Sequence, residues 1–223
     1  ECDWSSDVCS SDLNSDATGI GLTWAQYSPL AQTALLDISN NTSWPGTDGI
    51  WHDLSPFGSN GTVVGDISVI GNDPSGGRSL NLNTTGYLNF TNNNPLSACS
   101  GKSPAASMNF WIKFNPPGHH AQVGGCRQDD SAFYLLILNS GYTEARMYFS
   151  GSPIWTINVN YAPYFHQWHF VSFVAQPDKM DLYIDGQHKG SVTGISGSFS
   201  TLTSFYLGTD RGIDFHADGT QMG

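Results

Sequence analysis

Apolar and polar residues alternate with a period of two in the middle of this chain. In residues 108–114, MNFWIKF, the apolar Met108, Phe110 and Ile112 are separated by polar or amphipathic residues. Successive side chains of a β-strand point to opposite faces, so this pattern predicts a strand with one buried face. Ser131–Leu138 is apolar at nearly every position, which predicts a central strand that is covered on both faces.

Short apolar segments separated by turn residues recur along the rest of the sequence. The pair Asp185-Gly186 supplies the positive backbone φ angles that a type I′ hairpin turn requires. Many short strands without a convincing long helix predict an all-β sandwich of two antiparallel sheets. The other predicted strands are Thr33–Ile38, Ile50–Ser55, Gly61–Val64, Arg78–Leu82, Gly86–Thr91, Ala145–Phe149, Ile154–Asn160, Trp168–Ala175, Lys179–Ile184, Gln187–Thr193 and Thr203–Gly208.

The charge balance narrows the choice of partners. The chain carries 19 acidic and 8 basic residues, a formal net charge of −11. Phosphate binding requires a basic surface, so nucleic acid is not an expected partner. No apolar run approaches the length of a membrane span, so membrane insertion is not expected either. Almost all the acids are Asp, which suits loops that hold calcium and equally suits loops that only keep a domain in solution.

The N-terminal segment differs in character from the rest. Residues 1–13, ECDWSSDVCSSDL, repeat an S-S-D triplet without a strand or helix period. They resemble translated adapter sequence and predict a non-native leader, with a genuine leader as the alternative. Residues 14–32 are expected to form an irregular lead-in, and residues 33–223 a single domain. The remaining Cys99 and Cys126 predict either one disulfide, formed in an oxidising compartment, or two buried thiols.

Several segments, taken in their order and spacing, resemble the laminin G-like family of concanavalin A-type jelly rolls. They are residues 35–65 (LLDISNNTSWPGTDGIWHDLSPFGSNGTVVG), 76–90 (GGRSLNLNTTGYLNF), 108–114 (MNFWIKF), 167–191 (QWHFVSFVAQPDKMDLYIDGQHKGS) and 205–210 (FYLGTD). The resemblance implies a concanavalin A-like jelly-roll sandwich acting as a non-catalytic, lectin-like carbohydrate-binding or adhesion module. Its partners would be glycans or cell-surface glycoproteins, and its location extracellular or on a cell surface. A structural or receptor-binding jelly roll on a virion or phage-like particle is the alternative.

The chain departs from the family pattern in two places. Leu82-Asn83-Thr84 stands where the family usually has Phe-Asp-Gly, so an acidic residue of that pattern is neutral here. The segment GIDFHADGTQMG, residues 212–223, resembles the beginning of the final strand, which in the family returns beside an early strand. The resemblance therefore implies that the sandwich lacks its last strand.

Aromatic side chains in loops are the first candidates for sugar binding, because such rings stack on the apolar faces of sugars. Tyr142, Tyr161 and Tyr164 are expected in loops at an exposed rim, whereas Trp155 could face either way along its strand. Arg127 in the polar loop CRQDD could hydrogen-bond sugar hydroxyls. The alternative for the aromatic residues is that they fill the core. Trp51 and Trp168 belong to strand motifs, and both are expected to be buried.

Loop aspartates are the candidates for a calcium site. Calcium takes six to eight oxygen ligands, and Asp129, Asp130, Asp210 and Asp214 could supply some of them. The EF-hand spacing is absent, so solvated loops are the alternative. The nearby pair His166 and His169 is expected to pack or hydrogen-bond, since side chains three apart on a strand face opposite ways.

A β-glucanase-type glycosidase is the enzyme alternative on the same fold. Retaining hydrolysis requires two carboxylic acids about 5–5.5 Å apart, and that group carries them in a Glu-x-Asp-x-(x)-Glu motif, which is absent here. Glu1 lies in the leader segment, and Glu144 stands alone in a turn. The sequence therefore favours a binding module over an enzyme.

Overall fold

The structure is a computed structural model of the whole chain. It divides into two units, Glu1–Ala31 and Gln32–Gly223, and every residue that can be described belongs to the second. The described residues are 48–54, 58–71, 78–82, 85–90, 106–115, 121–127, 131–137, 142–149, 154–199, 204–209 and 220–222. The N-terminal leader, the irregular lead-in and the predicted strand Thr33–Ile38 lie outside these residues.

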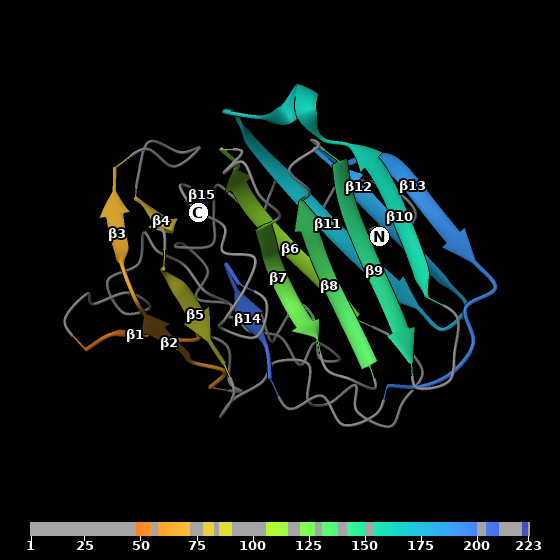
Figure 1. Cartoon of the computed structure of the whole chain (residues 1–223), viewed down its shortest axis with the longest axis horizontal. Coiled ribbons are helices and arrows are strands. Elements are labelled where there is room, and N and C mark those ends of the chain that lie inside the picture. Colours follow the sequence, from red (N-terminus) through yellow and green to blue (C-terminus); the bar gives the residue numbers. More distant parts are fainter. Residues whose placement is uncertain are drawn as a thin grey trace, which may run out of the picture. The chain divides into compact units, whose positions relative to one another are not determined.

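The described residues form two antiparallel sheets, as the sequence predicts (Figure 1). The eight-stranded sheet has the order β1 (Ile50–Trp51), β2 (Gly61–Val64), β5 (Tyr87–Asn89), β14 (Tyr206–Leu207), β7 (Ala121–Arg127), β8 (Ser131–Ile137), β9 (Tyr142–Phe149) and β10 (Trp155–Asn160). The seven-stranded sheet has the order β13 (Gln187–Thr193), β12 (Lys179–Ile184), β11 (Trp168–Gln176), β6 (Ala106–Lys113), β15 (Thr220–Met222), β4 (Ser79–Leu82) and β3 (Ile67–Ile70).

The core lies between the two sheets. Phe133 on β8 stacks on Phe173 on β11 with ring centroids 4.4 Å apart, so the inner faces of the two sheets are in direct contact. Alternating residues of β6 and β11, such as Met108, Ile112 and Val171, are buried in the same cluster. This burial of one face of each strand is the source of the period-two pattern in the sequence.

The helical content of the described residues is small. The one helical element there is a short 3-10 helix, η3 (Ala162–Tyr164), which leads from β10 to β11. No described helix has the length and apolar character needed to cross a membrane.

Two strands were not predicted from the sequence. β3 is a short edge strand that pairs only with β4 in the described sheet. β7 has the sequence AQVGGCR, in which Gly124 and Gly125 interrupt any alternation and a register irregularity lies between Gln122 and Gly124. β3 pairs with the next strand in the chain, and β7 pairs with the next strand, β8, and with the distant β14. In β7 it is the glycine pair and the register irregularity that obscure the strand pattern.

The chain's C-terminal segment joins the seven-stranded sheet. β15 pairs with β4 on one side, where Met222 is in register with Leu80, and with β6 on the other. The segment that resembles a return strand thus joins the sheet between β4 and β6. The early strand expected beside the last strand lies outside the described residues, so the missing last strand stays a prediction.

The β12–β13 hairpin has the predicted turn geometry. Asp185 and Gly186 have φ angles of 52° and 72°, the positive values that a type I′ turn requires. The Asp185 carboxylate accepts a hydrogen bond from the Phe170 backbone N–H at 3.0 Å and contacts His169 Nδ1 at 2.6 Å. The predicted hydrogen-bonding role of His169 is confirmed, and His166 likewise contacts Asn115 Oδ1 through its Nδ1 at 2.9 Å.

Replacing Asp185 with alanine is expected to lower the free energy of unfolding by about 2–3 kcal/mol, because alanine disfavours positive φ and cannot accept the Phe170 N–H. Asp185→Asn is the matched control, since asparagine tolerates the left-handed region and keeps a side-chain acceptor. It should cost about 1 kcal/mol or less. Urea unfolding of the three proteins measures both effects, and equal losses for the two variants would contradict this account of the turn.

Candidate functional site

The outer face of the seven-stranded sheet carries an exposed tryptophan. Along β6, Met108, Phe110 and Ile112 point toward the core, and the residues that alternate with them point away from it. Trp111 is therefore on the outer face, where 39% of its surface is exposed. A single exposed ring is common on protein surfaces, so what matters for binding is whether further apolar rings lie beside it.

Three further aromatic residues share this outer face. Phe170 on β11 is in register with Trp111, and their ring centroids are 5.4 Å apart. Trp168 precedes Phe170 by two positions, and Tyr183 on β12 lies between the buried Leu182 and Ile184. We call Trp111, Trp168, Phe170 and Tyr183 the aromatic face. All four are at least partly exposed, so flat ring surface is available to a ligand.

A group of charged residues borders the aromatic face next to Tyr183. The Asp181 side chain, only 3% exposed, contacts Lys179 Nζ at 2.9 Å and His188 Nε2 at 3.0 Å. The hydrogen bond that Lys179 donates to Asp181 raises the pKa of the lysine ammonium group. The His188 ring packs edge-on against Tyr183, with centroids 5.3 Å apart. Asp181 therefore fixes His188 beside the aromatic face, where the imidazole is available to hydrogen-bond a ligand.

Polar residues without charge complete this outer face. Asn109 on β6 and Ser172 on β11 are in register with each other, and Ser172 is in register with Tyr183. Asn109 is exposed and Ser172 is partly exposed. The sheet thus presents hydroxyl and amide groups beside aromatic rings, an arrangement that can hold an uncharged polyhydroxylated ligand.

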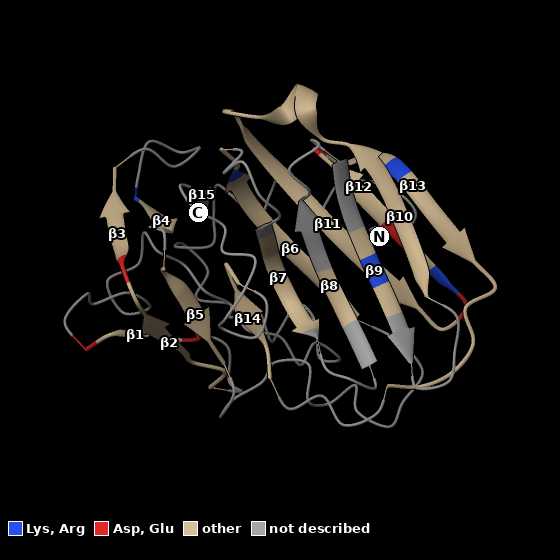
Figure 2. Cartoon of the chain, viewed as in Figure 1, with Lys and Arg blue, Asp and Glu red and all other residues tan. Residues whose placement is uncertain are grey.

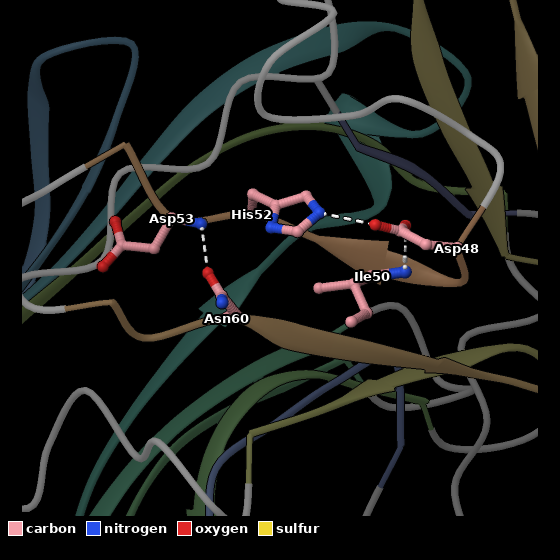
Figure 3. Close-up of polar contacts among 5 residues, drawn as sticks. All are labelled: Asp48, Ile50, His52, Asp53 and Asn60. Atoms are coloured by element: carbon pink, nitrogen blue, oxygen red, sulfur yellow. Dashed lines mark hydrogen bonds and ion pairs between the residues drawn. The ribbon is translucent and has the colours of Figure 1, made fainter.

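A second polar cluster lies on both sides of β1 and holds the turn before β1 and the loop between β1 and β2 (Figure 3). Asn60 Oδ1 accepts the Asp53 backbone N–H at 2.8 Å. Asp48 accepts the Ile50 N–H at 3.0 Å and contacts His52 Nε2 at 2.7 Å, and the hydrogen bond from His52 lowers the pKa of the Asp48 carboxyl. These side chains use their polar atoms on the loop, so we assign them no ligand.

Comparison with known protein families identifies the fold family. A laminin G family model, described as the concanavalin A-like lectin/glucanases superfamily, matches residues 82–220. The chain belongs to this superfamily. No curated protein matches the chain. The resemblance seen in the sequence is confirmed, and the two antiparallel sheets are those of a concanavalin A-like jelly roll.

Solved structures share the fold of this superfamily member at low sequence identity. The receptor-binding domain of botulinum neurotoxin D is 19% identical, with a TM-score of 0.63, over 86% of this chain and 48% of that chain. Domain 4 of AbnA, an extracellular arabinanase from Geobacillus stearothermophilus, is 20% identical, with a TM-score of 0.61, over 85% of this chain and 90% of that domain. The chain thus spans about half the length of the toxin domain and most of the arabinanase domain.

Three of the predicted sugar-binding residues do not form an exposed rim on this superfamily domain. Tyr161 is only 1% exposed and packs against Phe114, Tyr164 and Phe165. Tyr164 and Trp155 are partly buried against the core. The expected exposed rim is wrong for Tyr161, because its ring is buried where the chain leaves β10 and enters η3. Tyr164 is only partly exposed. Trp155, which could have faced either way, is in register with the core residue Met147 and packs against the core.

Of the other predicted site residues, Tyr142 and Arg127 are described by their backbone alone, and the rest lie outside the described residues. Tyr142 begins β9 and Arg127 ends β7, so neither backbone forms the loop that was expected. The four calcium candidates, Asp129, Asp130, Asp210 and Asp214, and the cysteine Cys99 lie outside the described residues. Cys126 is buried, and its pairing with Cys99 stays a prediction. Within the described part of the chain, no three His, Cys, Asp or Glu side chains cluster as metal ligands.

Sequence reasoning missed the aromatic face, although part of its signal is local. The alternation in residues 108–114 already places Trp111 opposite Met108 and Ile112. Trp51 is buried as expected, but Trp168 is only partly buried. The signal that was absent is the register of β11 against β6, which places Phe170 beside Trp111.

Proposed function

We propose that this domain binds glycans through the aromatic face, as a non-catalytic module of an extracellular or surface-displayed protein. The observation that carries the proposal is the exposed Trp111 ring beside Phe170 on an open sheet face. Aromatic rings stack on the apolar C–H faces of sugars, and neighbouring hydroxyl and amide groups satisfy the sugar hydroxyls. Asn109, Ser172 and His188 provide such groups next to the rings.

The similar folds support a glycan as the ligand class. Domain 4 of AbnA was solved in complex with arabinotriose, and the binding domain of botulinum neurotoxin DC was solved in complex with SialylT. Binding without hydrolysis is proposed because Asp181, the carboxylate beside the aromatic face, is engaged by Lys179 and His188. A retaining glycosidase requires a pair of carboxylic acids, and the Glu-x-Asp-x-(x)-Glu motif that supplies the pair in β-glucanase-type enzymes is absent from the sequence.

Trp111→Ala is expected to weaken glycan binding roughly ten- to a hundredfold, since a stacked aromatic ring behaves as a binding hot spot. A glycan array selects the ligand, and calorimetric titration of the best oligosaccharide measures the loss. Ile154→Ala is the matched control, because Ile154 is 57% exposed and lies just before β10 in the other sheet. Both variants remove an exposed apolar side chain, so both should melt close to the temperature of the parent protein.

Each arm of this titration has a decisive outcome. Equal weakening by both variants would show that the aromatic face is not the site. Release of reducing sugar from the bound oligosaccharide would overturn the non-catalytic assignment. A parallel titration in EDTA tests the calcium site predicted at Asp129, Asp130, Asp210 and Asp214, because chelation weakens binding only where the ion contributes to it.

A further inference from the structure

Lys113 occupies the end of the aromatic face opposite the charged group around Asp181. It is the last residue of β6, and it is in register with Trp168 on β11. Trp111 precedes it by two positions on the same strand and therefore shares its face. On the strand backbones, Lys113 is thus next to the positions of two members of the aromatic face, Trp111 and Trp168.

Lys113 differs from the other lysine and arginine residues in the interactions of its charged group. Lys179 is paired with Asp181, Lys189 donates to Gln187 and lies over the Tyr164 ring, and Arg146 lies over the Tyr134 ring. Arg78 is also engaged. Among cations whose side chains are described, Lys113 is the one for which the structure shows no hydrogen bond, ion pair or ring contact. Charged residues are sparse on the described strands (Figure 2).

The residues in register with Lys113 carry no acid. The row crosses five strands of the seven-stranded sheet and consists of Trp168, Lys113, Gln221, Asn81 and Ser68. Although the chain has 19 acidic and 8 basic residues, Lys113 is thus in register only with neutral, hydrogen-bonding residue types. Such a row can satisfy sugar hydroxyls while leaving the ammonium group available to one anionic substituent.

We propose that Lys113 makes the aromatic face selective for glycans that carry an isolated acidic group, which it binds beside Trp168. This inference rests on the proposed glycan-binding function and adds the chemical class of the ligand. The acidic group is a carboxylate or a sulfate, since both accept charge-assisted hydrogen bonds from an ammonium group. The net charge of −11 repels a densely charged polymer, so a sparsely charged glycan is the one selected.

The test compares matched ligands that differ only in charge. The probes are an oligogalacturonide and its fully methyl-esterified form, a sulfated and an unsulfated galactan oligosaccharide, and heparin as the dense polyanion. At low salt the acidic member of a pair is expected to bind about three- to tenfold tighter than its neutral partner. The preference should shrink as ionic strength rises, because salt screens an exposed charge pair.

Three variants assign the preference to the residue. Lys113→Gln should abolish the difference between acidic and neutral ligands while retaining binding of the neutral form, and Lys113→Arg should keep the difference. Lys189→Gln is the matched control, because it changes the net charge equally but lies on β13 beside Tyr164. That control should leave the preference unchanged. The carboxylate and sulfate arms together show which acidic group is accepted.

The outcomes separate this inference from the function on which it rests. Equal affinity of the parent protein for acidic and neutral ligands, or a preference that survives Lys113→Gln, overturns the role of Lys113 while Trp111-dependent binding stands. Tighter binding of heparin than of the oligosaccharides also overturns it. If no glycan binds, or if Trp111→Ala leaves every affinity unchanged, the proposed function fails and this inference fails with it.

Discussion

Gly65→Ala is expected to lower the free energy of unfolding by about 2–5 kcal/mol, the sum of a backbone and a packing penalty. Gly65 has a φ of 73°, a conformation that costs an L-residue about 1–2 kcal/mol. An added Cβ would also lie 2.1 Å from the carbonyl oxygen of Thr85. The obstruction is backbone, so relief requires the segment before β5 to move away from the segment after β2.

Gly49→Ala separates the two penalties. Gly49 has nearly the same φ, 71°, but nothing lies within 4 Å of its added Cβ. It should therefore lose only the backbone share, about 1–2 kcal/mol. Chemical denaturation of both variants gives the two losses. A Gly65 variant no less stable than the Gly49 variant would show that the two segments do not approach each other as described.

Tyr161→Ala is expected to cost about 3–5 kcal/mol, as truncation of a buried aromatic ring usually does. Its ring is enclosed by Phe114, Tyr164 and Phe165. Tyr161→Phe should instead be neutral or slightly stabilising at pH 7, because the buried hydroxyl has no hydrogen-bond partner. A binding tyrosine would behave differently, since removal of its hydroxyl would weaken ligand binding and removal of its ring would leave stability largely unchanged.

The pH dependence of stability tests the same burial. Burial, followed by the nearby charges of Asp185 and Tyr164, raises the pKa of the Tyr161 hydroxyl in the folded state. The unfolded chain releases this proton near pH 10, whereas the folded chain retains it. Between pH 10 and the higher folded pKa, the hydroxyl should therefore destabilise the domain by up to about 1.4 kcal/mol per pH unit.

Comparison with Tyr161→Phe isolates this contribution from that of the other tyrosines. The stability difference between parent and variant should be constant up to pH 9 and should move in favour of the variant above pH 10. Urea unfolding at pH 7, 9 and 11 measures it. A difference that stays constant to pH 11 would mean that Tyr161 ionises in the folded state as it does in water.

The sequence-based prediction of the binding site was wrong about which aromatic residues are exposed. The same physical cause explains the burial of Tyr161 and the exposure of Trp111. Tyr161 and Tyr164 stand among Asn, Ala and Pro in NYAPYF, a composition that is typical of exposed loops. The chain nevertheless turns through η3 and places both rings against the end of the core. Trp111, by contrast, lies in a strand with a strongly apolar sequence, yet it faces outward. Exposure of an aromatic residue follows from the face it occupies more than from the class of element that carries it.

The features that depend on local chemistry could be predicted from the amino-acid sequence. Alternation in residues 108–114 specified β6 and its buried face, and Asp185-Gly186 specified the hairpin turn through its positive φ angles. The order of the motifs specified the superfamily. These features need only neighbouring residues, because side-chain direction in a strand and φ in a tight turn are set within a few bonds.

Only the tertiary structure decided which distant segments meet. The register of β6 with β11 placed Phe170 beside Trp111 and Trp168 beside Lys113, although more than 50 positions separate the members of each pair in the sequence. The same sheet seated the C-terminal β15 between β4 and β6. Pairing between strands depends on burial of a whole sheet face and on loop closure over long distances, so no local pattern encodes it.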